Sequence, residues 1–411
     1  MERRVVITSA GIVSPIGNDV DTFIENIKNG VCGIDKITLF DNSDFKTKLA
    51  AEVKDFNPKD FGVENPKKKD RYLQFAIAAA NEAIKNSNFV VDNENEFRTG
   101  VVVGSGIGGL SSIQEEHSKF LSRGPKKISS HFIPKTIANM AAGHISINTG
   151  ARGVCSSEVT ACATGTDCIG RAYRLIKDGY QDAVFAGGSE AAICEVGIGG
   201  FEAMGALSFS DDKNRASIPF DAERNGFVMG EGSCILLLES LESAEKRGAE
   251  IICEIAGYGQ SSDAYHITAP NSDCLGITNA MKQAVDGAGI EKNKVEYINA
   301  HGTSTKLNDE IETSSIKHFF GDEAGKIAIS STKSMTGHML GATGAVEALV
   351  CAYALKEGFI PPTINHKEID EKCDLDYVTD GFRKKEIKYA MTNSLGFGGH
   401  NSSLLLKKYE K

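Results

Sequence analysis

Residues 159–179 read VTACATGTDCIGRAYRLIKDG, a run of small residues around Cys162 that leads into a helical pattern. Apolar residues recur after the cysteine at helical spacing, and the pattern stops at Gly179. The spacing predicts that Cys162 lies at the start of a helix, where free backbone N–H groups favour thiolate over thiol. The alternative is a small buried side chain, which is the commonest role of a free cysteine.

Strand-like and helix-like segments alternate along most of the chain. The predicted strands are 98–104, 182–188, 295–300 and 327–330, and the predicted helices are 72–86, 166–178, 275–288, 308–320 and 342–357. Such alternation indicates an α/β architecture in which helices cover the sheets. Catalytic groups are then expected in the loops at the ends of the strands.

Composition excludes several classes of protein. The formal charge of −10 argues against general nucleic-acid binding. No apolar run is long enough to span a bilayer, and residues 1–7 resemble a short strand rather than a signal peptide, so we expect a cytoplasmic protein. The ten cysteines form no CxxC pair, which disfavours a zinc or iron–sulfur framework, and they are expected to be reduced thiols.

Residues 104–109, Gly-Ser-Gly-Ile-Gly-Gly, fit the G-x-G-x-x-G pattern after a predicted strand. A dinucleotide site would need an acidic residue about 20 positions further on, and residues 121–124 are Leu-Ser-Arg-Gly. We therefore interpret this segment as a tight loop that allows close packing, with Ile107 projecting into a pocket.

Two further segments place polar side chains directly after predicted strands. Residues 299–305, Asn-Ala-His-Gly-Thr-Ser-Thr, carry His301, and residues 331–338, Ser-Thr-Lys-Ser-Met-Thr-Gly-His, carry Lys333 and His338. A thiolate nucleophile with neutral imidazoles that donate hydrogen bonds to an oxyanion suits carbonyl chemistry. Zinc ligation is the alternative, but the spacing offers no third and fourth ligand.

The glycine-rich segment 393–401, Asn-Ser-Leu-Gly-Phe-Gly-Gly-His-Asn, contains a single aromatic residue, Phe397. Glycines on both sides would allow this side chain to swing over a pocket. An ordinary loop anchored in the core explains the same pattern equally well.

Taken together, these segments resemble the β-ketoacyl-acyl-carrier-protein synthases, and within them the type II elongation enzymes of fatty acid synthesis. The matching motifs, in order, are TACATG at 160–165, PFDAERNGFVMGEG at 219–232, NAHGTST at 299–305, STKSMTGHMLGATGA at 331–345 and GFGGHN at 396–401. The resemblance covers nearly the whole chain. It implies a thiolase-like α/β fold of two similar halves in a layered αβαβα arrangement, with 1–250 carrying the nucleophile and 251–411 carrying two catalytic histidines.

The resemblance also implies a reaction. Cys162 would hold the acyl chain as a thioester, and malonyl-acyl carrier protein would lose carbon dioxide while His301 and His338 stabilise the enolate. Attack of this carbanion gives a 3-oxoacyl-acyl carrier protein two carbons longer. Lys333, with Glu347 behind it, would support the site electrostatically, and the backbone N–H groups of Cys162 and Phe397 would form the oxyanion hole.

Binding roles follow from the same resemblance. Thr303 and Thr305 would hold the phosphopantetheine arm, Phe397 would gate the acyl pocket and Ile107 would yield to longer chains. The remaining implied positions are Phe201 and Thr268 in substrate binding, and Lys67, Lys68, Lys69 and Arg71 in docking of the acidic carrier protein.

The implied assembly is a homodimer that binds neither nucleic acid nor membrane. The chemistry needs no redox cofactor and no catalytic metal; phosphopantetheine arrives on the carrier protein, and a structural monovalent cation is compatible with the resemblance.

Three residues depart from the family pattern. His400 stands where threonine is usual, Ala269 where serine is common and Gly205 where an arginine often meets the carrier protein.

Other functions fit parts of the same pattern. Polyketide synthesis uses the same three residues, so the sequence separates it poorly from fatty acid elongation. A thiolase would have a second cysteine in place of His338, and initiating synthases pair histidine with asparagine. A non-catalytic chain-length factor would lack Cys162, and a cysteine hydrolase would need only one histidine.

Overall fold

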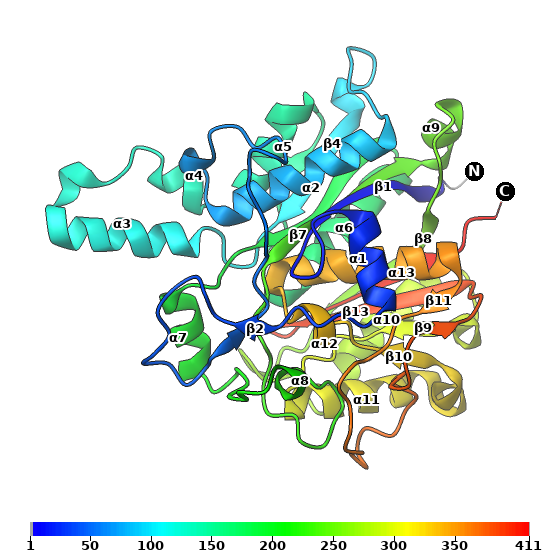
Figure 1. Ribbon diagram of the computed structural model, residues 1–411. Coiled ribbons are helices and arrows are strands. Elements are labelled where there is room, and N and C mark those ends of the chain that lie inside the picture. The colour runs from blue at the N-terminus through cyan, green and yellow to red at the C-terminus, as the bar shows by residue number, and fades with distance from the viewer. Residues whose placement is uncertain (1–2, 411) are drawn as a thin grey trace.

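The strand order of the second half of the chain repeats that of the first (Figure 1). The first half consists of β1 (Val5–Val13), β4 (Thr99–Gly104), β5 (Cys155–Ser156), β6 (Ala183–Glu190) and β7 (Gly232–Ser240), in the spatial order β1-β7-β6-β4-β5. The second half consists of β8 (Cys253–Ser262), β9 (Tyr297–Asn299), β10 (Ala328–Ser330), β13 (Tyr389–Gly396) and β14 (His400–Lys407), in the order β8-β14-β13-β9-β10. This computed structural model describes residues 3–410.

The directions of the strands repeat as well. In each half the first two pairings along the sheet are antiparallel and the last two are parallel. A short antiparallel pairing of β1 with β8 joins the halves into one ten-stranded sheet. The predicted α/β fold of two similar halves is therefore confirmed. The predicted boundary at 250/251 lies between the end of β7 and the start of β8.

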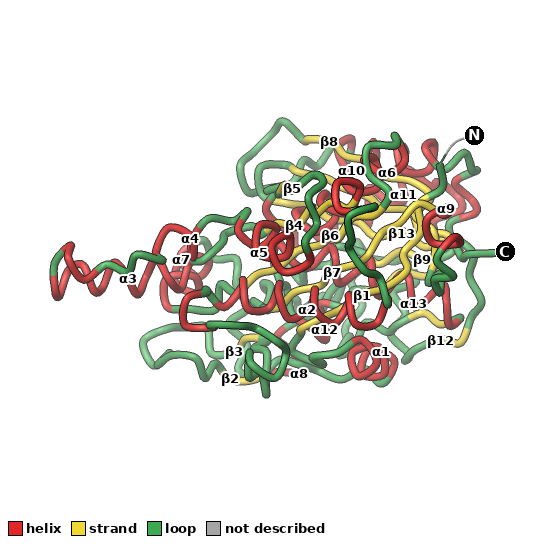
Figure 2. Tube along the Cα trace, turned by 90° about the horizontal axis from the view of Figure 1, so that it is seen from above, coloured by secondary structure: helices red, strands yellow, loops and turns green. Residues whose placement is uncertain are grey.

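The strands of each half of the chain make up one half-sheet of the ten-stranded sheet. Helices form three layers around these two half-sheets (Figures 1 and 2). On the outer face of the first half lie α2 (Arg71–Ser87) and α5 (Met140–Thr149), and on that of the second lie α10 (Leu275–Gly287) and α11 (Lys306–Phe320). Between the half-sheets lie α6 (Thr164–Lys177) and α13 (Thr343–Glu357), which contact strands of both halves. The layering is therefore αβαβα.

The central helices approach closely because glycine lies at their contact. A Cβ added to Gly344 would lie 2.0 Å from Thr166 Oγ1, and one added to Gly165 would lie 2.7 Å from the backbone N of Ala345. Most of α13 is buried, since sheets lie on both sides of it. Short 3-10 turns precede both helices, η4 (Ala161–Ala163) before α6 and η7 (Leu340–Ala342) before α13, and these turns contact each other.

The remaining elements are short or peripheral. They are α1 (Val20–Lys28), α3 (Leu110–Arg123), α4 (Phe132–Thr136), α7 (Glu195–Ala203), α8 (Lys213–Ala216), α9 (Leu241–Lys246), α12 (Lys333–Thr336), β2 (Asp35–Lys36), β3 (Leu49–Ala50), β11 (Phe359–Ile360), β12 (Arg383–Lys384), η1 (Pro66–Lys68), η2 (Glu96–Arg98), η3 (Pro125–Lys127), η5 (Lys292–Lys294) and η6 (Gly321–Lys326). Figure 1 shows α3 and α4 projecting from the body of the protein as an arm. Within residues 3–410, no helix has the length and apolarity needed to cross a membrane.

Candidate active site

Four side chains from both halves converge where the two central helices begin. Cys162 lies in η4 before α6, His301 follows β9, Lys333 begins α12 after β10, and His338 precedes η7 and α13. The Cys162 sulfur and a ring nitrogen of each histidine all lie within 4.8 Å of one another. The fold thus brings together residues that are up to 176 positions apart in the sequence, as Cys162 and His338 are.

A cavity of about 620 Å³ leads from this cluster to the surface. The lining residues that the sequence singled out are Cys162, His301, His338, Phe397, Thr303, Thr305, Phe201, Thr268, Ala269 and Gly205. Ile107 packs instead against the apolar cluster that contains Cys162, and Lys333 is buried behind the lining.

Cys162 lies at the start of a helix as predicted, but the expected preference for thiolate is wrong. Burial raises the pKa of the thiol to about 12, because desolvation penalises the charged form more than the nearby Lys333 ammonium stabilises it. The buried Glu190 carboxylate raises this pKa further, and the backbone N–H groups of Phe397 and Cys162 oppose the rise by donating hydrogen bonds to the sulfur. Both N–H groups are therefore placed to stabilise negative charge beside the thiol.

Both histidines are held neutral. Burial, followed by the positive charge of Lys333, lowers the pKa of His301 and of His338 well below its usual value. The two rings meet edge to face, with centroids 5.3 Å apart. His338 Nδ1 lies 3.0 Å from Thr343 Oγ1; when this hydroxyl donates, Nε2 carries the ring proton and can donate it to a substrate.

Two buried glutamates hold this constellation in place; the sequence motifs pointed to Glu347 but not to Glu312. Glu347 accepts a hydrogen bond from Lys333 Nζ, and both side chains are almost fully buried. Glu312, on α11, accepts from the backbone N–H groups of His301 and Gly302, each at 2.8 Å, and so fixes the turn that follows β9. The helical spacing of residues 308–320, which places Glu312 on the buried face of α11, is the signal that could have identified it.

The glycine loop at 104–109 is occupied by a carboxylate of the protein itself. Glu190, the last residue of β6, accepts from Ser105 Oγ at 2.7 Å and from the backbone N–H groups of Gly106 and Gly341 at 2.9 and 3.0 Å. The backbone donors that a dinucleotide phosphate would need are thus already used. A Cβ added to Gly341 would lie 2.4 Å from the Gly106 nitrogen, which confirms that the loop serves close packing.

Phe397 lies at the tip of the β13–β14 hairpin, beside the nucleophile. The turn contains Gly398 and Gly399 at φ +90° and +74°, conformations that favour glycine. The Phe397 ring faces Phe201 at a centroid distance of 6.4 Å. The ring of His400 packs against Gly398, where an added Cβ would lie 3.1 Å from it, so this departure from the family pattern fills space beside the turn.

Polar atoms near the base of the site lack hydrogen-bond partners among the described residues. They include both side-chain polar atoms of Asn299, Glu347 Oε2 and Thr392 Oγ1. Asn299 and Thr392 are paired across β9 and β13, and Asn299 and Glu347 both lie near the buried side chain of Tyr297. Amide and carboxylate oxygens are suitable ligands for an alkali-metal cation, so these residues fit such an ion.

Cys162, His301 and His338 also form a set of ligand types that binds zinc in other proteins. The spacing in the sequence had suggested that no third ligand was present, and the structure supplies Cys162. The buried Lys333 ammonium acts electrostatically on all three groups, and its positive charge disfavours a divalent cation between them.

The four basic residues at 67–71 are not equivalent. Lys67 and Lys68 are exposed on η1, whereas Lys69 is half-buried and donates to the Glu64 carbonyl. Arg71 forms a bidentate ion pair with the fully buried Glu231, at 2.6 and 2.9 Å. Since its guanidinium stabilises a buried carboxylate, Arg71 does not belong to the exposed basic surface.

Comparison with known proteins places this geometry in a family. The model of the beta-ketoacyl synthase N-terminal domain matches residues 2–244, and that of the C-terminal domain matches residues 252–367. The chain belongs to the β-ketoacyl synthase family. Relatives include proteins named 3-oxoacyl-[acyl-carrier-protein] synthase 2 from Staphylococcus aureus strain N315, 49% identical with 99% of each chain covered, and from Synechocystis, 47% identical with 100% and 99% covered.

Solved structures of the family share the fold. A beta-ketoacyl synthase from Burkholderia phymatum matches with a TM-score of 0.91 at 32% identity, covering 99% of this chain and 100% of that one. A type II PKS acyl-carrier protein in complex with its ketosynthase bound to the hexaketide matches with a TM-score of 0.93 at 35% identity, covering 100% of both chains. The thiolase-like arrangement predicted from the motifs is thereby confirmed.

The raised pKa of Cys162 predicts how its alkylation by iodoacetamide depends on pH. Because only the thiolate reacts, the rate at Cys162 should rise about tenfold per pH unit from pH 7 to 10 without a plateau. In the double variant Lys333→Met/Glu347→Gln, loss of the ammonium should slow the reaction about tenfold at a given pH. Peptide mass spectrometry resolves Cys162 from the other cysteines, and Lys326→Met is the matched control. A plateau below pH 9 in the unmodified protein would contradict this account.

Proposed function

We propose that this protein catalyses the decarboxylative condensation of malonyl-acyl carrier protein with an acyl group carried on Cys162, in fatty acid elongation. The observation that carries the proposal is the convergence of one thiol, two neutral imidazoles and a buried ammonium at the inner end of a cavity. The chain is 47–49% identical to the relatives named 3-oxoacyl-[acyl-carrier-protein] synthase 2 but 35% identical to the polyketide ketosynthase described above. The higher identity favours fatty acid elongation over polyketide synthesis.

The first half-reaction loads the enzyme. The Cys162 sulfur attacks the carbonyl carbon of the acyl thioester, while the backbone N–H groups of Cys162 and Phe397 stabilise the oxyanion that develops. The carrier thiolate leaves and takes up the proton that Cys162 gives away. Burial penalises the charged thiolate and so raises the pKa of the thiol. A thiolate that does form is poorly solvated, and it is therefore more reactive toward the thioester carbonyl.

The second half-reaction forms the carbon–carbon bond. The malonyl carboxylate leaves as carbon dioxide, and its bonding electrons form an enolate whose oxygen accepts hydrogen bonds from His301 and His338. The enolate carbon attacks the Cys162 thioester, and the cysteine leaves as a thiolate that regains a proton. Neutral imidazoles suit this role, since an N–H donor stabilises the enolate without protonating its carbon.

The direct test supplies purified protein with acyl- and malonyl-carrier protein and identifies products by mass spectrometry. We expect an acyl adduct on Cys162, release of carbon dioxide and a 3-oxoacyl product two carbons longer. Cys162→Ala should abolish condensation. His301→Ala and His338→Ala should each slow malonyl decarboxylation by about a hundredfold or more, because each removes an oxyanion donor.

Two results would contradict the proposal. Release of free fatty acid alone would indicate a cysteine hydrolase, and normal decarboxylation in both histidine variants would refute their assigned role. The matched control is His318→Ala, which replaces an exposed histidine near the end of α11.

We also propose a homodimer in which the arm of one copy covers the other. Strand β5 is a free edge of the ten-stranded sheet, and α5, which contacts it, leads through α4 to the projecting arm. Exposed apolar residues lie along this continuous region: Phe120, Leu121, Ile128, Ile133, Ile137, Ile147 and Val159. A second copy can cover this surface and pair its own β5 with the free edge.

Sedimentation should therefore give twice the mass of one chain. The double variant Leu121→Glu/Ile133→Glu should shift the protein toward monomer, because each carboxylate would be buried against an apolar partner surface. Val90→Glu, at an equally exposed apolar position outside this region, is the control. A monomeric unmodified protein would refute the homodimer.

Carrier-protein docking is assigned to Lys67, Lys68 and, to a smaller degree, Lys69. Exposed lysines raise the rate of encounter with an acidic partner more than they raise affinity. Lys67→Glu/Lys68→Glu should lower kcat/KM for carrier-bound substrates severalfold at low salt, with the difference shrinking as ionic strength rises. Lys384→Glu/Lys385→Glu, an exposed pair at the end of β12 and outside the proposed dimer surface, is the control; an equal loss in both variants would reject a specific docking site. We place this reaction in the cytoplasm with its carrier protein.

We further propose that Asn299, Glu347 and Thr392 hold a structural monovalent cation. An ion of this kind would satisfy buried oxygens that have no other partner and leave the reaction itself to the protein side chains. Replacing potassium and sodium by tetramethylammonium should lower the thermal unfolding temperature by several degrees, and Asn299→Ala should abolish this dependence. An unfolding temperature that is equal in all three salts would refute the site. Chelators of divalent metals should leave activity unchanged.

A further inference from the structure

Charged side chains are scarce on the wall of the active-site cavity. Apart from the two histidines, the lining residues carry one carboxylate, Asp263, and one ammonium, Lys306. Asp263 already accepts hydrogen bonds from Asn401 Nδ2 at 2.6 Å and from the backbone N–H of Asn271 at 3.2 Å. Lys306 is exposed, and within residues 3–410 its ammonium makes no ion pair or hydrogen bond. The cavity wall therefore offers one ammonium that no carboxylate pairs with.

The segment that carries Lys306 runs from the reacting centre to the surface. His301 is 3% exposed and Thr303 is 6% exposed, Thr305 is half-buried and Lys306 is exposed. All four residues line the cavity, and the hydroxyls of Thr303 and Thr305 lie 2.9 Å apart. A substrate arm that reaches Cys162 along this segment would pass the two hydroxyls and leave the cavity beside Lys306.

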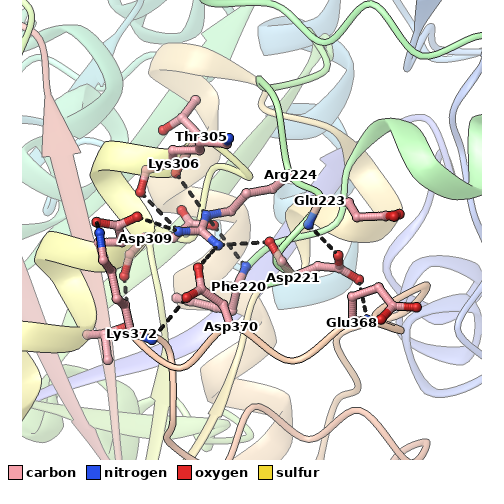
Figure 3. A network of polar contacts seen from close by, with 12 residues as sticks. Phe220, Asp221, Glu223, Arg224, Thr305, Lys306, Asp309, Glu368, Asp370 and Lys372 are labelled. Carbon is pink, nitrogen blue, oxygen red and sulfur yellow. Dashed lines mark hydrogen bonds and ion pairs between the residues drawn. The ribbon is translucent and has the colours of Figure 1, made fainter.

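The backbone of this segment is anchored by a buried arginine (Figure 3). The Arg224 guanidinium, 1% exposed, donates to the carbonyl oxygens of Lys306 at 3.1 Å and of Thr305 at 3.4 Å. It also donates to the Asp221 carbonyl at 2.8 Å and to Asp370 at 2.6 Å. The main chain of Lys306 is thus held while its ammonium stays available to a ligand.

The carboxylates nearest to Lys306 along α11 are already engaged. Asp309 accepts from the backbone N–H of Phe220 at 2.9 Å and lies 3.6 Å from Arg224. Glu310 is paired with Lys372 at 2.9 Å and with Arg224 at 3.4 Å. A lysine in a helix can reach a glutamate four positions on, but here that glutamate, Glu310, is already paired with two other cations.

We propose that the Lys306 ammonium binds the phosphate of a phosphopantetheine thioester at the mouth of the cavity. This inference rests on the proposed function, since it assumes that pantetheine thioesters are the substrates. The groups of the phosphopantetheine arm then match the groups of the cavity. The thioester lies at Cys162, the neutral amides lie beside the hydroxyls of Thr303 and Thr305, and the phosphate lies beside the Lys306 ammonium. Gly205, on the same cavity wall, contributes no side chain that could compete for the phosphate.

The phosphate can come from a carrier-linked diester or from coenzyme A, so the test compares four malonyl donors with the same acylated enzyme. They are malonyl-pantetheine, malonyl-phosphopantetheine, malonyl-coenzyme A and malonyl-carrier protein. Lys306→Gln should raise KM about fivefold for the donors that carry phosphate and leave KM for malonyl-pantetheine and every kcat unchanged. Lys306→Arg should restore KM, and the difference should shrink at high salt.

A matched control is Lys294→Gln, which removes an exposed lysine that precedes β9 at the end opposite His301. It should leave KM unchanged for all four donors, and a rise equal to that of Lys306→Gln would refute a local contact. An increase confined to the carrier-linked donor would mean that Lys306 meets the carrier surface, which overturns the proposal. An equal increase for malonyl-pantetheine, or no change for any donor, would also overturn it. An unmodified enzyme that condenses none of the four donors would instead refute the proposed function.

Discussion

The close contact between α6 and α13 is the constraint on which the site depends. Gly165 and Gly344 leave no room for a Cβ, so the two central helices begin side by side and bring Cys162 within reach of His338. Both half-sheets pack against this pair, which removes the site from water. Any residue larger than glycine at Gly344 would separate the helix starts and lengthen the distance across which the acyl group must be attacked.

Removal from water sets the electrostatics of the site. Burial raises the pKa of the thiol and lowers the pKa of both imidazoles, so the resting site has a neutral nucleophile and neutral donors. Its one ammonium, on Lys333, is balanced by Glu347. Negative charge therefore appears only as bonds change, and the fixed N–H donors and the ammonium meet it without rearrangement.

Much of this was predictable from the sequence, and the exceptions have physical causes. The predicted helices lie within two residues of the observed ones, because amphipathic spacing is local, and the motifs identified the four converging side chains. The ionisation of Cys162 was predicted wrongly, since burial is a property of the whole fold. Glu190 and Arg224 were missed because their partners lie far along the chain. Arg71 looked like a surface charge until Glu231 was placed beside it.

The repeated strand order has an evolutionary consequence. In each half a 3-10 turn with a left-handed first residue leads into the central helix, and both turns continue with Ala-Thr-Gly, at 163–165 and at 342–344. The middle of the turn is Cys162 in one half and Gly341 in the other. Duplication of one ancestral lobe explains this identity. The two copies then diverged at equivalent positions: one gained a nucleophile, and the other has the glycine against which the 104–109 loop packs.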